Sequence, residues 1–142
     1  MLLRLTGTAG CPILSAMSAS SPSKITAQMV SIWRDAALAG VALAEGEDSS
    51  GWNLVFERAL AFTEADRKAG QDTYCITNEA GVAVYGGVTS WAIRGGELKL
   101  ALDERTSGEL GLASDLTVAL ACPPASIDEL SAALTEILAP KG

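Results

Sequence analysis

Hydrophobic residues recur at every second position in two segments of the second half of the chain. Over residues 97–103 they are Leu98, Leu100 and Leu102, and over residues 115–122 they are Leu116, Val118, Leu120 and Cys122. A period of two is typical of a strand that buries one face. We therefore predict strands in both segments. Pro123 and Pro124 should end the second one, because proline lacks the backbone N–H of a ladder bond.

Earlier segments also predict strands. Residues 35–60 read as a β-hairpin, because Val41 and Leu43 alternate with small residues before the polar turn EGEDSSG (45–51). The returning arm places three apolar side chains on one face, which are Trp52, Leu54 and Phe56. The alanine-rich first arm is also compatible with a helix. Further strands are predicted at 72–77, 82–87 and 88–94, with turns at NEAG (78–81) and at Gly95-Gly96.

Three segments predict helices. Residues 63–70 begin with a capping-box pattern, Thr63 and Asp66, and Gly70 stands where the helix would end. Residues 104–111 form a second short helix that ends at Gly111. The third helix, over 126–139, begins with a second capping-box pattern at Ser126 and Glu129. It carries an apolar stripe made of Ile127, Leu130, Leu134, Ile137 and Leu138.

This order of elements predicts an α+β fold. Few connections are long enough to be crossovers, so we expect a mostly antiparallel sheet of about six to seven strands. The C-terminal helix should pack on the leucine faces of the late strands, and two short helices should connect strands. We interpret residues 31–142 as a single α+β domain, since a chain of 142 residues is typical of one domain.

Residues 1–30 are interpreted as a flexible N-terminal extension. Thr6 and Gly7 interrupt its apolar start, which is shorter than the core of about 7 to 15 residues in a signal peptide. An export signal remains an alternative, as does a start at Met17 or Met29. No run approaches the about 18 apolar residues of a membrane span, so no membrane association is expected.

Charge and composition exclude several functions. Ten basic and seventeen acidic residues give a net charge of −7, which opposes nucleic-acid binding and favours a basic partner. The chain has no histidine, so it cannot use a Ser-His or Cys-His nucleophile pair or a histidine-ligated zinc ion. We expect no cofactor and no metal. The cysteines show no paired metal spacing and fit a reducing cytoplasm; they are Cys11, Cys75 and Cys122.

Cys75 and the carboxylates are the candidates for catalysis. A reactive Cys75 would need a neighbouring cation or helix N-terminus, and a small packed thiol is the simpler interpretation. Nothing marks two carboxylates as partners, and no calcium-loop pattern organises them. The pair Gly86-Gly87 matches no nucleotide-binding motif and predicts a bend between strands. A small-ligand domain or an enzyme that uses carboxylates or Cys75 remains the alternative function.

The run DRKAGQDTYCITNEAGVAVYGGVTSWAIRGGELKLALDERTSGELGL (66–112) resembles the immunity proteins of bacterial polymorphic toxin systems, in the family catalogued as the tenth. The resemblance lies in DTYC, then VYGGV, then the tryptophan of SWAI, and it extends from about Ala36 to Leu138. It implies a small, non-catalytic, cytoplasmic α+β protein that binds and neutralises a cognate toxin domain. The matching positions are Asp72, Tyr74, Cys75, Tyr85, Gly86, Gly87 and Trp91.

Of these positions, we assign Asp72, Cys75, Gly86 and Gly87 to the fold. The partner-binding surface is expected to be acidic and aromatic, because aromatic side chains dominate binding energy at interfaces. Its candidate residues are Tyr74, Tyr85, Trp91 and Trp52, with Glu45, Glu47 and Asp48 of the acidic turn. The expected partner is therefore a protein toxin, and self-association is compatible with this interpretation.

Overall fold

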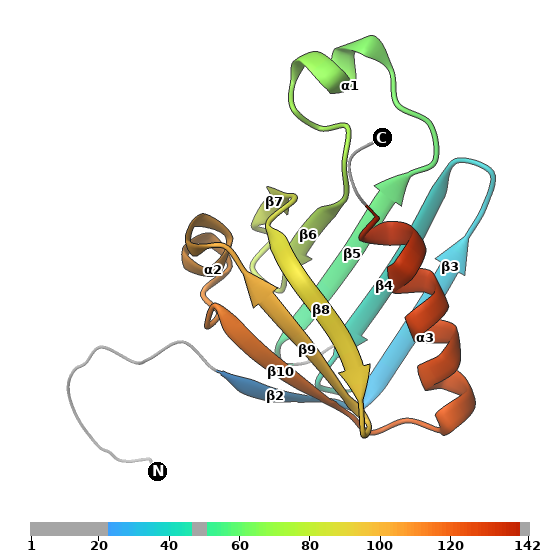
Figure 1. Cartoon of the computed structure of the whole chain (residues 1–142), viewed down its shortest axis with the longest axis vertical. Coiled ribbons are helices and arrows are strands. Elements are labelled where there is room, and N and C mark those ends of the chain that lie inside the picture. Colours follow the sequence, from blue (N-terminus) through green and yellow to red (C-terminus); the bar gives the residue numbers. More distant parts are fainter. Residues whose placement is uncertain (1–22, 47–50, 140–142) are drawn as a thin grey trace.

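The computed structural model describes residues 23–46 and 51–139 of the chain. Within these ranges the chain forms two β-sheets and three α-helices (Figure 1). The predicted α+β class is confirmed. The predicted single sheet of six to seven strands is wrong, because the strands divide into a four-stranded and a five-stranded sheet.

The four-stranded sheet has the order β2-β10-β9-β8. Its strands are β2 (Lys24–Ala27), β10 (Asp115–Leu120), β9 (Glu97–Leu102) and β8 (Val88–Arg94). Strand β10 is parallel to β2 and antiparallel to β9, which is antiparallel to β8. The alternation predicted in the late strands is confirmed, since Leu98, Leu116 and Val118 are at most 1% exposed.

The five-stranded sheet is antiparallel throughout, in the order β3-β4-β5-β6-β7. Its strands are β3 (Met29–Arg34), β4 (Leu38–Ala44), β5 (Asn53–Ala59), β6 (Cys75–Asn78) and β7 (Ala83–Tyr85). Strands β4 and β5 pair in register from Leu38 opposite Ala59 to Ala44 opposite Asn53, which confirms the predicted hairpin.

The chain passes from one sheet to the other at two corners. Only Gln28 separates β2 from β3, and only Gly86 and Gly87 separate β7 from β8. Both glycines have positive φ, +75° and +104°, which side chains with a Cβ rarely adopt. A Cβ on Gly87 would also overlap Thr106, at 2.7 Å from its Cβ. The predicted bend at this pair is therefore a change of sheet.

The first described strand begins at Lys24, before the predicted start of the domain at residue 31. Strand β2 and the first two residues of β3 fall within the segment expected to be an extension, and β2 pairs with β10 along its whole length. Four residues such as Lys24–Ala27 carry too short a pattern to predict a strand, so tertiary pairing decides their conformation. Residues 1–22 lie outside the described residues.

The two short helices follow the prediction closely. Helix α1 (Glu64–Lys68) begins with the Thr63–Asp66 capping box, in which Thr63 N–H donates to Asp66 Oδ2 at 2.8 Å. Helix α2 (Glu104–Leu110) ends at Gly111, which has φ +70° and caps the helix in the left-handed conformation.

Helix α3 (Pro124–Ile137) differs from the prediction at its start and in its packing. The predicted capping box of Ser126 and Glu129 is wrong, because the helix begins at Pro124, two residues before Ser126. Its N-cap is Pro123, and no side chain caps the helix. Proline suits this first turn since its missing N–H would have no helical partner. The helix packs mainly against β4, β3 and β5, and less on the late strands. The leucines of β9 and β10 instead face the five-stranded sheet.

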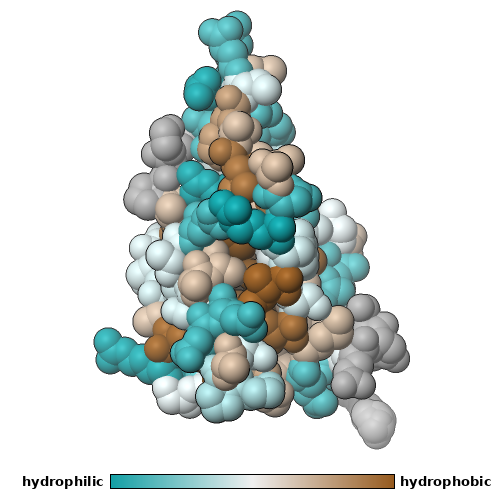
Figure 2. Space-filling view, turned by 90° about the vertical axis from the view of Figure 1, so that its right-hand side faces the viewer, coloured by the Kyte–Doolittle hydropathy of each residue, from teal (hydrophilic) through white to brown (hydrophobic). Residues whose placement is uncertain are grey.

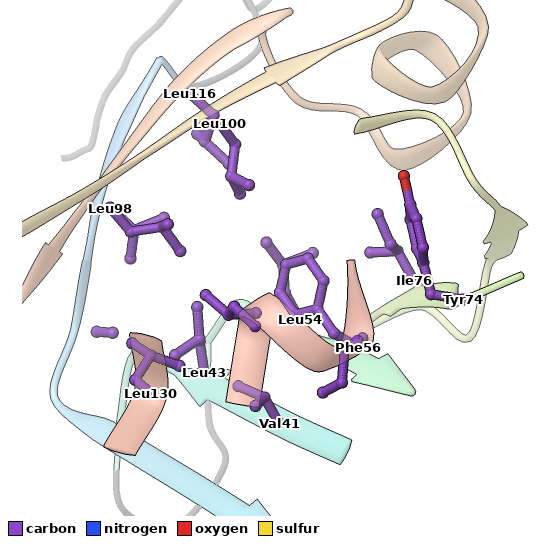
Figure 3. Close-up of a cluster of buried hydrophobic side chains, with 14 of the residues drawn as sticks. Val41, Leu43, Leu54, Phe56, Tyr74, Ile76, Leu98, Leu100, Leu116 and Leu130 are labelled. Atoms are coloured by element: carbon purple, nitrogen blue, oxygen red, sulfur yellow. The ribbon is translucent and has the colours of Figure 1, made fainter. Parts of the chain in front are cut away.

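A single core joins both sheets and α3 (Figure 3). Phe56 and Leu43 from the five-stranded sheet meet Leu98 and Leu116 from the other sheet, and Leu130 enters from α3. All five side chains are at most 1% exposed. This core covers one face of the five-stranded sheet and leaves its opposite face outside.

Candidate functional site

Tyr74 is a core residue. Its side chain is 6% exposed, and its hydroxyl accepts a hydrogen bond from the Val88 N–H at 2.8 Å. Burial raises the pKa of this hydroxyl. Figure 3 shows the ring directed into the cluster of buried side chains. Tyr74 was a candidate for the partner-binding surface, but its side chain is buried on the same strand face as the core residue Ile76.

The two candidate tryptophans are half-buried. Trp91 on β8 and Trp52 before β5 both pack against the core. The backbone of Trp52 also closes the hairpin with Glu45, since the Glu45 N–H donates to the Trp52 carbonyl at 3.1 Å. The Glu45 carboxylate accepts from the Trp52 N–H at 3.3 Å. Glu47 and Asp48 lie outside the described residues.

The four positions assigned to the fold from the sequence, Asp72, Cys75, Gly86 and Gly87, differ in their surroundings. Asp72 is 8% exposed, and Gly86-Gly87 form the corner described above. Cys75 is half-buried on β6, with its Sγ 3.8 Å from Thr77 Oγ1. Burial raises the pKa of the Cys122 thiol, which fits a packed and unreactive side chain.

Tyr85 lies on the face of the five-stranded sheet that points away from the core, which we call the outer face. Tyr85 is 38% exposed, whereas its neighbour Val84 is buried on the core side. Two rows of side chains cross the outer face from β3 to β7. The first row is Trp33, Gly40, Glu57, Cys75 and Tyr85, and the second is Ser31, Ala42, Val55, Thr77 and Ala83.

Trp33 is a feature of the outer face that the sequence analysis missed. Its indole lies on Gly40 of the neighbouring strand, so a Cβ at Gly40 would overlap the ring. A glycine opposite a cross-strand tryptophan lets the ring lie flat on the sheet. The available signal was the cluster of residues that favour strands in MVSIWR, namely Val30, Ile32 and Trp33, but this segment lay at the border of the expected extension.

A shallow groove of about 230 Å³ lies between α1 and the Tyr85 end of the outer face. Its walls include the carboxylates of Glu57 and Asp66 beside Phe62, Cys75 and Tyr85. Neither lysine nor arginine is among the described residues that line it. The side chains that line this groove are therefore acidic, aromatic or small.

Within the described ranges, no three metal-ligating side chains gather into a potential ion site. No helix in that part of the chain is long and apolar enough to cross a membrane. The outer face thus has an aromatic ring at each end and mostly small side chains between them, with the carboxylate of Glu57 at its centre.

No curated protein matches the chain. The family model described as Immunity protein 10 matches residues 26–128, which include every described strand except the first two residues of β2. The chain therefore belongs to the Immunity protein 10 family.

Proposed function

We propose that this protein neutralises a cognate bacterial toxin by binding the toxin domain through the outer face, without catalysis and in the cytoplasm. The observation that carries the proposal is the composition of this face in a member of an immunity-protein family. Its second row contains only small or uncharged side chains, and its first row ends in Trp33 and Tyr85. Helix α3 lies on the other side of the sheet.

Small side chains allow a partner to approach the sheet closely, and exposed aromatic rings supply anchoring energy. Tyr85 is the aromatic candidate of the sequence analysis that remains exposed, at 38%. Trp33 joins it from the opposite edge of the sheet. Five strands at a spacing of about 4.8 Å make the face roughly 20 Å wide, which suits the centre of a protein interface.

The charge of the chain supports a basic partner. The net charge is −7, and Glu57 stands between Gly40 and Cys75 in the first row. Complementary charge speeds association and disfavours incorrect partners. A toxin domain that attacks nucleic acid needs a basic surface of its own. A carboxylate-rich inhibitor could cover such a surface.

The test is binding of the purified protein to the toxin domain encoded beside it, measured by calorimetry. Tyr85→Ala and Glu57→Lys should each weaken binding by about tenfold or more. Thr117→Ala, on the outer side of the four-stranded sheet, is the matched control and should bind like the wild type. Circular dichroism should show that all three variants fold. Wild-type affinity in both outer-face variants would contradict the proposal.

The alternative of a small-ligand domain or enzyme has less support. The groove that holds Cys75 and Glu57 measures about 230 Å³, below the roughly 300 to 1,000 Å³ of typical ligand pockets. Alkylation of Cys75 distinguishes the two functions. Turnover of a small substrate that stops on alkylation would favour the enzyme, whereas slower toxin binding alone would favour the interface.

A further inference from the structure

Among the described strands, β3 forms one edge of the five-stranded sheet, so half of its backbone N–H and C=O groups point away from its neighbour β4. The Asp35 N–H donates to the Leu38 carbonyl at 3.0 Å, which closes the turn between β3 and β4. Hydrogen-bonded pairs alternate along an antiparallel ladder. Trp33 and Ser31 therefore bond to β4, and the N–H and C=O groups of Val30 and Ile32 face outwards.

Among the described sheet edges, β3 is the one that is long and regular. Strand β7 has three residues and β2 has four. Strand β8 carries a register shift between Val88 and Ser90, and the N–H of Val88 already donates a hydrogen bond to the Tyr74 hydroxyl. Strand β3 pairs with β4 without a shift from Met29 to Arg34 and contains neither lysine nor proline. Short length, register shifts, lysine and proline usually protect an edge strand, because an unprotected edge can pair with a strand of another chain.

A groove of about 310 Å³ runs beside this edge, between β3 and α3. Its apolar wall includes Ile32, which is 39% exposed, and two alanines of α3, Ala132 and Ala133. Figure 2 faces this side of the molecule and shows hydrophobic residues gathered next to hydrophilic ones. The groove therefore has room for the side chains of a strand laid along β3.

Charge indicates what such a strand would carry. Arg34 is held by Glu136 through two hydrogen bonds, each of 3.0 Å, so its positive charge is already paired. Glu129 also lines the groove and is exposed. A second copy of the chain would add its own net charge of −7 and its own α3 carboxylates to this site. A basic segment would instead be attracted.

We propose that β3 binds an extended, basic segment of the toxin as an added strand of the five-stranded sheet. This inference rests on the proposed toxin-binding function and extends its interface from the outer face around Trp33 to the edge. Backbone bonds to Val30 and Ile32 supply affinity, and alternate side chains of the added strand enter the groove beside Glu129. Five strands that are together roughly 20 Å wide and about 20 Å long give the outer face an area of roughly 400 Å², which is less than the about 800 Å² per partner of a standard interface.

The test uses Ile32→Pro in the full chain, with Ile32→Ala as its matched control. Proline removes the outward N–H and blocks an added strand, and it is tolerated on an edge where that N–H faces solvent. Ile32→Ala shortens the side chain but keeps the N–H. We expect Ile32→Pro to weaken toxin binding by about tenfold or more, and Ile32→Ala to weaken it clearly less.

A second measurement makes the test independent of how the proline variant folds. Hydrogen exchange at the amides of Val30 and Ile32 in the wild-type protein should slow at least tenfold when the toxin domain binds. Unchanged exchange, or equal affinity in both Ile32 variants, would overturn the inference. So would a wild-type dimer that Ile32→Pro dissociates, because a second copy would then occupy the edge.

These outcomes separate the two proposals. If Tyr85→Ala weakens binding and Ile32→Pro does not, the outer face is the interface and the edge is not. If the wild-type protein does not bind the toxin domain at all, the proposed function fails, and the inference about β3 fails with it.

Discussion

The Tyr74 hydroxyl binds both backbone groups of Val88, accepting from its N–H at 2.8 Å and donating to its carbonyl at 3.5 Å. Tyr74 immediately precedes β6 of the five-stranded sheet, and Val88 begins β8 of the four-stranded sheet. The pair therefore joins the two sheets beside the Gly86-Gly87 corner. A residue expected to contact a partner instead holds the sandwich together.

Tyr74→Phe should lower the free energy of unfolding by about 1 to 3 kcal/mol, because the Val88 N–H would lose its buried acceptor. Urea denaturation followed by circular dichroism measures this change. Tyr85→Phe is the control and should leave stability nearly unchanged, since Tyr85 is 38% exposed. Equal stability of the two variants would show that the bond to Val88 contributes nothing.

Stability should also fall at alkaline pH because of Tyr74. Burial raises the pKa of its hydroxyl above the value of about 10 in an unfolded chain. The folded protein then holds this proton more tightly, so the stabilising effect is complete below pH 10 and is lost as the pH rises above it. Urea midpoints between pH 9 and 11 should decline less steeply in Tyr74→Phe. Parallel declines in both proteins would refute this assignment.

Alanine substitutions at Gly86 and Gly87 should lower the free energy of unfolding by different amounts. A Cβ on Gly86 would fit, since the nearest atom is Thr73 Cγ2 at 3.8 Å. Gly86→Ala should therefore lower the free energy of unfolding by about 1 to 2 kcal/mol, because of its positive φ alone. Gly87→Ala would also overlap Thr106, which adds about 1 to 3 kcal/mol. Thermal unfolding of both variants measures the difference. A double variant, Gly87→Ala with Thr106→Ala, should recover part of the loss.

The Arg34–Glu136 pair should stabilise α3 on β3 only while both groups are charged. Hydrogen bonds from Arg34 lower the pKa of Glu136, so its contribution is present above pH 4 to 5 and is lost as the pH falls through the folded pKa. Glu136→Gln should lower the melting temperature slightly at pH 7 and low salt. The difference should vanish near 1 M salt or near pH 2, because the exposed pair is then screened or neutral. A persistent difference would indicate packing, not charge.

Short-range patterns predicted several elements correctly. The Thr63–Asp66 capping box, the helix end at Gly111 and the hairpin of β4 and β5 all depend on residues close together in sequence. Helix α3 was located, but Pro123 and not Ser126 caps it. Helix α3 begins at Pro124 because proline is favoured in the first turn of a helix, and the capping-box pattern that starts at Ser126 is not used.

The candidate site was predicted only in part. Alternation assigned Tyr74 to the same strand face as Ile76, yet it could not show that this face meets the second sheet. Tyr85, on the other face of the β6–β7 hairpin, remained exposed. Trp33 was missed because its role depends on Gly40 in the neighbouring strand, and that register is not visible in the local sequence.

The amino-acid sequence by itself determined the local elements, the negative charge and the absence of imidazole chemistry, because these follow from residue type and short-range spacing. Only the tertiary structure decided that the strands form two sheets, that α3 packs on β3 to β5, and which aromatic rings reach solvent. Those outcomes depend on which apolar faces pack against each other, and that packing is determined by residues that lie far apart in the chain.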